Sequence, residues 1–191
     1  MGQGRITGLL GLALLLIAAA ALASGCGAAA DSAGAADGPA QHGGRLTVAM
    51  EQPPNCLNAW IVCGGMASTS TITSPLFDSL LITEADGTKV PLLATEVPTT
   101  ENGSVVVTKS GGMDVTVHLV REGRWSDGKP ITCDDLKFTQ GLMMDDRWMV
   151  SSRTGYELVK SVECVDPLTA IYHFKERYAP FLSVVGGTPL P

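Results

Sequence analysis

The chain has 191 residues, of which 45% are hydrophobic and only 5% are aromatic. Its 19 aspartate and glutamate residues outnumber the 13 lysine and arginine residues, which gives a formal net charge of −6 at pH 7. An acidic chain without a cluster of basic residues has no electrostatic attraction to a phosphate backbone, so nucleic-acid binding is excluded as a function class.

The first 25 residues have the pattern of an export signal. Arg5 supplies a positive start, residues 9–23 form an apolar run, and small residues lead into Cys26. This order is typical of a secretory signal peptide. A cysteine directly after the cleavage site indicates a bacterial lipoprotein in which Cys26 carries a diacylglyceryl group. We therefore expect a signal peptide at 1–25 and a protein that is exported and anchored to the outer face of the bacterial cytoplasmic membrane.

Two other interpretations of this segment stay open. A retained membrane helix needs about 20 apolar residues, and the run barely approaches that length, with Gly8 directly before it and Gly11 within it. Ordinary secretory cleavage near Ala23 would instead leave Cys26 as an unmodified thiol.

Residues 26–44 are rich in alanine and glycine and show no apolar periodicity. Such a stretch cannot bury a core, so we expect a flexible tether between the lipidated cysteine and a folded domain at 45–191.

The first part of this domain predicts short strands around one helix. Residues 45–50 alternate as in a strand, and residues 66–81 have helical spacing, with Pro75 as a start or a kink. The Asp-Gly pair within residues 84–87 favours a reversal, after which residues 90–94 return as a short extended segment.

The second part predicts a hairpin, a capped helix and two further strands. Residues 104–109 and 114–120 form the hairpin, whose inward side chains are Val115, Val117 and Leu119. Thr132 has the pattern of a helix cap. The helix after it should direct the following side chains toward a core: Leu136, Phe138, Leu142, Met143 and Met149. Strands are expected at 156–164 and 168–174, so the fold class is α+β.

Five cysteines are present. If Cys26 is lipidated, four remain, which is an even number in an oxidising compartment. Of the three pairings that four cysteines allow, we expect Cys56 with Cys63 and Cys133 with Cys164. A four-cysteine zinc site is the alternative, but the chain has no C-x-x-C spacing, and unpaired buried thiols are a further alternative.

The sequence has few groups that could carry catalysis. His42, His118 and His173 lack metal-ligand spacing, and neither H-E-x-x-H nor G-x-S-x-G occurs. Helix capping explains the acidic pair at 134–135, and solvation explains the pair at 145–146. We therefore expect no enzyme, no catalytic residue, no metal and no cofactor.

Two blocks of sequence carry a family resemblance. The first is residues 75–81 (PLFDSLL), followed by the Asp-Gly pair and by residues 90–94. The second comprises residues 115–120 (VTVHLV), 121–123 (REG), 125–132 (WSDGKPIT) and 134–138 (DDLKF). From about Arg45 to Pro191 the chain resembles the extracytoplasmic solute-binding proteins of family 5, which are the oligopeptide- and dipeptide-binding components of ABC importers.

The resemblance implies a fold and a binding mode. The fold would be part of the first lobe of a two-lobed periplasmic-binding-protein (type II-like) architecture, a mixed sheet with flanking helices. Family members bind ligand in a cleft between two lobes that close by a hinge motion. They are far longer than this chain, so we expect 45–191 to be a truncated, N-terminal part of the family domain, with the acidic anchor for a peptide amino terminus beyond Pro191.

The resemblance also implies roles for particular residues. Residues 52–66 resemble a loop that lines the cleft, which makes Asn58 and Trp60 candidates for ligand contact. The alternative is that both residues only order a disulfide-stapled loop. Trp125 and Gly128 are expected to define the fold, Trp125 as a packed anchor and Gly128 as a backbone reversal.

The function implied is that of a lipid-anchored substrate-binding protein that captures peptides and delivers them to ABC permease subunits. Within this class the solute could instead be a nickel chelate, a sugar or a glutathione-like thiol. The alternative is a truncated remnant or a surface lipoprotein that binds no solute.

Overall fold

The computed structural model describes residues 43–45, 47–58, 60–61 and 66–191. The chain divides into two compact units, Met1–Thr47 and Val48–Pro191, and every helix and strand below belongs to the second. The predicted signal peptide, Cys26 and nearly all of the predicted tether lie outside the described residues. Within the described part, no helix is both long and apolar enough to cross a membrane.

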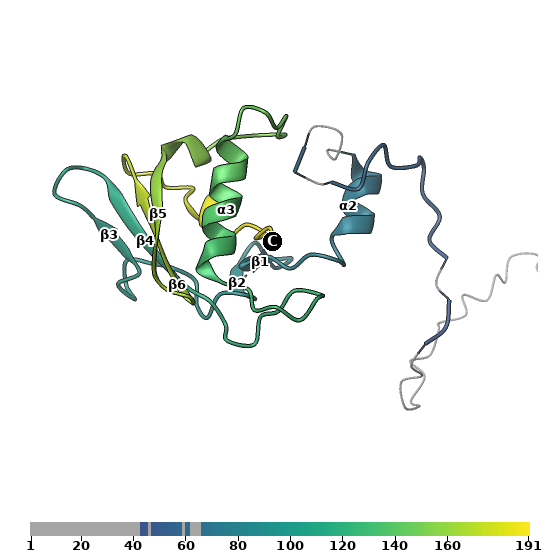
Figure 1. The fold of residues 1–191 in the computed structure, drawn as a ribbon, viewed down its shortest axis with the longest axis horizontal. Helices are drawn as coiled ribbons and strands as arrows, with labels where there is room; N and C mark the ends of the chain where they lie inside the picture. Colours follow the sequence, from purple (N-terminus) through teal and green to yellow (C-terminus); the bar gives the residue numbers. More distant parts are fainter. Residues whose placement is uncertain (1–42, 46, 59, 62–65) are drawn as a thin grey trace, which may run out of the picture. The chain divides into compact units, whose positions relative to one another are not determined.

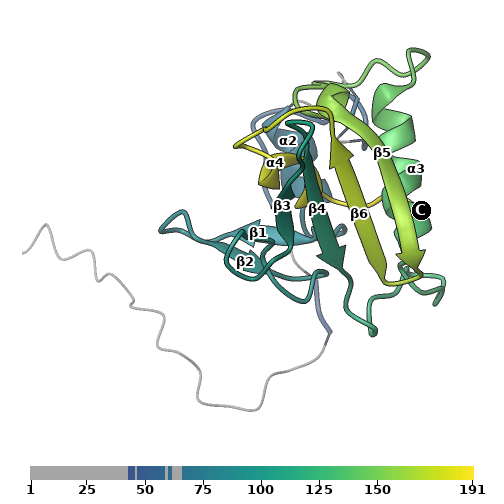
Figure 2. The same cartoon turned by 90° about the vertical axis from the view of Figure 1, so that its left-hand side faces the viewer.

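A four-stranded sheet is the largest element of the second unit (Figure 2). Its strands are β3 (Val105–Val107), β4 (Met113–His118), β5 (Val159–Asp166) and β6 (Thr169–Phe174). They lie in the order β3-β4-β6-β5, and all of their pairings are antiparallel. Val115 and Val117 of β4 are buried, as is Leu119 just beyond it, which confirms the predicted hairpin and its inward side chains.

Helix α3 (Cys133–Met144) packs against one face of this sheet (Figure 1). Thr132 precedes it with extended backbone, and its N–H donates to the Asp135 carboxylate at 2.7 Å, so the predicted cap is confirmed. Leu136 and Met143 face the core. Phe138 and Met149 do not, because they are 51% and 76% exposed, and the prediction that they are core residues is wrong. Phe138 lies two positions after Leu136, which in a helix is a different face, and Met149 follows the end of α3.

The hairpin predicted around residues 84–87 is also present. Strands β1 (Leu81–Thr83) and β2 (Lys89–Pro91) pair antiparallel with Ile82 opposite Val90. The turn between them is held by the Asp86 carboxylate, which accepts the Thr88 N–H at 2.8 Å and has its pKa lowered by that bond.

Helix α2 (Ala67–Thr73) is shorter than the helix predicted at 66–81. Its C-cap is Ser74, which still has helical backbone and donates its N–H to the Ser70 carbonyl. Pro75 has no N–H with which to continue this hydrogen bonding, so Pro75 marks an end. Leu80 and Leu81 are buried, and their N–H groups donate to the carbonyls of Gly187 and Gly186. These two residues belong to the core through their contacts with the last segment of the chain.

Two short helices complete the fold, the 3-10 helix η2 (Tyr156–Leu158) and α4 (Leu182–Val185). The strand predicted at 45–50 is not present among the described residues of that range, and Val48 is 58% exposed. A strand requires a neighbour for its ladder hydrogen bonds, and none of the described strands lies beside this segment. The resemblance implies a mixed sheet, whereas the described strands pair only antiparallel.

Candidate functional site

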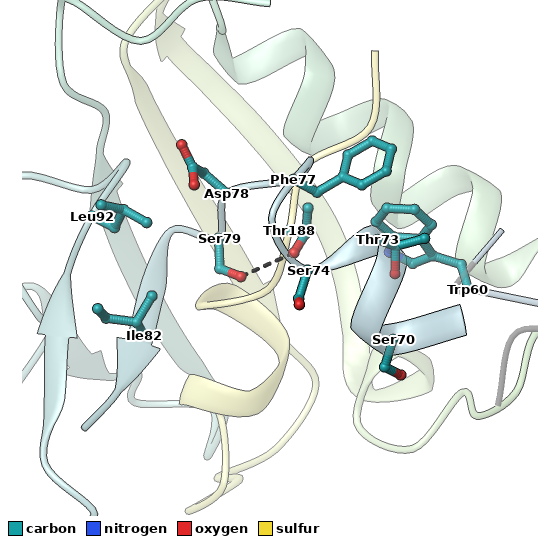
Figure 3. A pocket seen from close by; sticks show the side chains of 10 residues that line it. All are labelled: Trp60, Ser70, Thr73, Ser74, Phe77, Asp78, Ser79, Ile82, Leu92 and Thr188. Atoms are coloured by element: carbon teal, nitrogen blue, oxygen red, sulfur yellow. Dashed lines mark hydrogen bonds between the residues drawn. The ribbon is translucent and has the colours of Figure 1, made fainter. Parts of the chain in front are cut away.

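A pocket of about 430 Å³ lies beside α2 and the β1–β2 hairpin (Figure 3). Two aromatic rings, five hydroxyl groups, one carboxylate and two aliphatic side chains line it. These are Trp60, Phe77, Ser70, Thr73, Ser74, Ser79, Thr188, Asp78, Ile82 and Leu92. The pocket therefore combines apolar surface with hydroxyl groups, the composition of a site that binds by packing and hydrogen bonds.

Trp60 reaches this pocket from the loop before α2. The backbone N–H of Trp60 donates to the side-chain oxygen of Asn58 at 3.0 Å, and its backbone carbonyl accepts the backbone N–H of Ser151 at 3.0 Å. Its ring meets Phe77 edge to face, with 5.1 Å between ring centroids. The structure thus separates the two residues predicted from the sequence, since Trp60 lines the pocket and Asn58 holds the loop.

The opposite side of the pocket joins distant parts of the chain. The hydroxyl groups of Ser79 and Thr188 lie 3.0 Å apart and are hydrogen-bonded (Figure 3). Sequence reasoning did not single out either residue, and an isolated serine or threonine gives no signal of such a role. Phe77, Asp78 and Ser79 all lie in the first family block, so that block contributes to the pocket as well as to the fold.

Asp78 is the one ionisable group among the lining residues. No described side chain forms an ion pair with it. The lining residues include no histidine, cysteine or lysine, and no cluster in the described part of the chain could hold a metal ion. The arrangement therefore supports binding of a solute and offers no nucleophile–base pair.

Trp125 and Ser126 of the Trp-Ser-Asp-Gly turn line a second, larger hollow of about 650 Å³, together with Leu93, Val120 and Ile131 among others. In this turn the N–H of Trp125 donates to the Lys129 carbonyl at 2.8 Å, and Gly128 adopts a positive φ of 87°. The hydrogen bond from Lys129 lowers the pKa of the Asp127 carboxyl. Trp125 packs against the hydrophobic core, so the predicted structural roles of Trp125 and Gly128 are confirmed.

The described cysteines agree with an oxidised protein. Cys133 and Cys164 form a disulfide with 5.7 Å between their Cα atoms, which confirms that predicted pair. Cys56 is also disulfide-bonded. Cys63 lies outside the described residues, so the pairing of Cys56 with Cys63 stays a prediction.

The fold and the pocket define a solute-binding class of protein, and comparison with known proteins gives the family. Residues 88–191 match the family described as "Bacterial extracellular solute-binding proteins, family 5 Middle". The chain belongs to this family, so the resemblance seen in its sequence is confirmed.

Curated relatives agree with this assignment. The chain is 27% identical over 150 residues to the oligopeptide-binding protein OppA of Mycobacterium tuberculosis and of Mycobacterium bovis. The match covers 77% of this chain and 24% of each relative. The chain therefore spans about a quarter of the length of these relatives.

Solved structures show the same fold. An oligopeptide-binding protein from Thermus thermophilus, crystallised with a pentapeptide, matches with a TM-score of 0.58 and 29% identity over 71% of this chain and 22% of its own. The protein AgaA from A. tumefaciens R10, in complex with agropinic acid, matches with a TM-score of 0.59 over 72% of this chain and 26% of its own. Its 19% identity supports the fold alone. The matched proteins are two-lobed periplasmic binding proteins, and this chain corresponds to part of that architecture.

Proposed function

We propose that this chain belongs to a lipid-anchored substrate-binding protein that captures peptides outside the membrane for an ABC importer. The observation that carries the proposal is the family match together with the 29% identity to an oligopeptide-binding protein crystallised with a pentapeptide. In this proposal residues 1–25 are the export signal, Cys26 carries the lipid, and residues 26–44 tether the domain to the outer face of the cytoplasmic membrane. The partners are the peptide and the permease subunits.

Within the domain we assign one wall of the peptide site to the pocket beside α2. The rings of Trp60 and Phe77 supply apolar contact area, and the hydroxyl groups of Ser70, Ser74 and Thr188 are donors and acceptors for a peptide main chain. Hydrogen bonds to main-chain groups do not depend on the side chains of the peptide. A pocket of this kind therefore suits many peptide sequences.

The test is a calorimetric titration of the whole exported protein that contains this chain, expressed in its own organism, with an equimolar mixture of unblocked pentapeptides. We expect binding, and we expect Trp60→Ala to weaken it about tenfold or more, because the variant removes a large ring from the pocket. Trp148→Ala is the matched control, since Trp148 is 41% exposed and does not line the pocket.

Circular dichroism melts of both variants separate lost binding from lost folding. If both variants are folded and bind pentapeptides with equal affinity, the pocket beside α2 is not part of the peptide site. A folded whole protein that binds no pentapeptide would contradict the proposed function and favour a surface lipoprotein that binds no solute.

A further inference from the structure

A row of three titratable side chains crosses the four-stranded sheet. Asp114 lies on β4, His173 on β6 and Glu163 on β5. These three strands are neighbours in the sheet (Figure 2). His173 lies between Tyr172 and Phe174, which are both buried in the core. Because side chains alternate along a strand, the row lies on the face opposite the core.

The imidazole ring of His173 joins the two carboxylates. Its Nδ1 is 2.7 Å from Oδ1 of Asp114, the residue directly opposite it in the β4–β6 register. Its Nε2 is 3.0 Å from Oε2 of Glu163, which lies diagonally across the β5–β6 pair, opposite Ile171. Both nitrogens are therefore within hydrogen-bond distance of an ionisable oxygen.

The proton count follows from the chemistry of these groups. An ionised carboxylate can only accept a hydrogen bond, so each ring nitrogen must carry a proton if both bonds are to form. Only the imidazolium has two N–H groups. A neutral ring keeps one bond and directs the lone pair of its other nitrogen at a carboxylate oxygen, which is repulsive.

We propose that Asp114, His173 and Glu163 form a pH-sensitive clasp that joins β4, β6 and β5 while His173 is protonated and loses one of its two bonds when the proton leaves. The clasp is a conformational device of the sheet, separate from the proposed peptide pocket. The two carboxylates bond to opposite edges of the ring, so one cation could not be held by all three side chains.

The direction of the pH dependence follows from the pKa of His173. The hydrogen bond with Asp114 is the largest cause and raises this pKa, partial burial opposes it, and the bond with Glu163 raises the pKa further, so that the pKa lies above its ordinary value. A histidine whose pKa is higher in the folded protein than in the unfolded chain stabilises the fold fully below the unfolded value, about 6.5. That stability is lost as the pH rises through the folded pKa. The clasp therefore contributes more to the stability of the sheet at pH 5.5 than at pH 8.5.

Two lysine residues and two hydroxyl groups of the β3–β4 turn also lie near the imidazole ring of His173. A hollow of about 430 Å³ beside it is lined by Lys160 of β5 and by Lys175, which directly follows β6. The Lys175 ammonium group donates to the Glu157 carbonyl at 2.6 Å. The β3–β4 turn adds only the hydroxyl groups of Thr108 and Ser110 to this lining. All of these groups are retained in the variants below, so differences between the variants report the two carboxylates.

The first test is an NMR titration of the histidine side chains in the full chain between pH 5 and pH 9. His173 in the urea-unfolded chain is the internal control. We expect His173 to titrate at a higher pH in the folded chain than in the unfolded chain. Asp114→Asn and Glu163→Gln should each lower the midpoint of His173, and the double variant should lower it most. Equal midpoints for His173 in the folded and the unfolded wild-type chain would overturn the proposal.

The second test measures the melting temperature at pH 5.5 and pH 8.5. The wild-type chain should lose about 2–4 °C more than the double variant Asp114→Asn/Glu163→Gln on going to the higher pH. The same loss in both proteins would overturn the clasp even if the His173 midpoint is raised. If the double variant does not fold, His173→Gln gives the same comparison, since it removes the titrating group and retains both carboxylates.

Discussion

Gly155 occupies a position where both the backbone conformation and the packing of neighbouring side chains require glycine. It precedes η2 with a φ of 88°, a conformation that residues with a Cβ rarely adopt. A Cβ added here would lie 2.7 Å from a methyl carbon of Val184 and 2.8 Å from the ring of Tyr178. We expect Gly155→Ala to lower the free energy of unfolding by about 2–4 kcal/mol, through left-handed backbone strain and overpacking together.

Gly141 is the matched control for that substitution. It lies within α3, its φ is not positive, and a Cβ added to it would meet no atom within 4 Å. Gly141→Ala should raise the free energy of unfolding by about 0.5–1 kcal/mol, because alanine restricts the unfolded chain and favours helix. Urea denaturation of both variants measures the difference, and a Gly155→Ala variant as stable as Gly141→Ala would contradict this account.

Single residues also show what the sequence could predict about the site. Trp60 could be found because a family resemblance drew attention to its loop. Thr188 and Ser79 could not, because their hydroxyl groups meet only when residues 109 positions apart in the chain are brought together. In the sequence His173 is only a histidine on a strand, since Asp114 and Glu163 become its neighbours through the strand register.

The link between α3 and β5 is the clearest feature at the scale of elements. The disulfide joins Cys133, the first residue of α3, to Cys164 of β5 across a sequence separation of 31 residues. A cross-link over a loop of this length restricts the unfolded chain. We expect Cys133→Ala/Cys164→Ala to lower the free energy of unfolding by about 3–4 kcal/mol in urea denaturation.

The matched variant is Cys164→Ala alone, which removes the same bond but keeps the buried Cys133 side chain. Both variants should lose nearly the same stability, because the cross-link carries the effect. A loss confined to the double variant would show that packing of Cys133 is responsible instead.

Elements with a strong local signal were predictable. The β3–β4 hairpin and the cap at Thr132 depend on turn residues and periodicity, which are local properties of the sequence. The helix predicted through Leu81 ends before Pro75, a local effect, whereas the positions of Leu80 and Leu81 and the absence of the strand predicted at 45–50 have non-local reasons. The N–H groups of Leu80 and Leu81 donate to the carbonyls of Gly187 and Gly186, which are distant in the sequence. Residues 45–50 pair with no strand in the described part of the chain.

At the scale of the whole molecule, the chain has the fold of its family and, in our proposal, a lipid anchor to the membrane. The fold could be predicted because the two blocks of sequence that resemble the family are local motifs. The second block contains the Trp-Ser-Asp-Gly turn, and the first contains part of the pocket. The relatives are about four times as long as the matched segment. The second wall of a peptide site, the permease and the lipid are therefore parts of the proposal that the described residues do not contain.

Native mass spectrometry of the protein extracted from the membrane of its own organism tests the central claim most directly, because lipid and ligand appear in one spectrum. We predict a chain that begins at Cys26, carries the mass of a diacylglyceryl group, and shows peptide adducts that disappear on denaturation. Cys26→Ala should lose the lipid mass and leave the membrane fraction. An unlipidated chain without peptide adducts, recovered from the native source, would contradict the account.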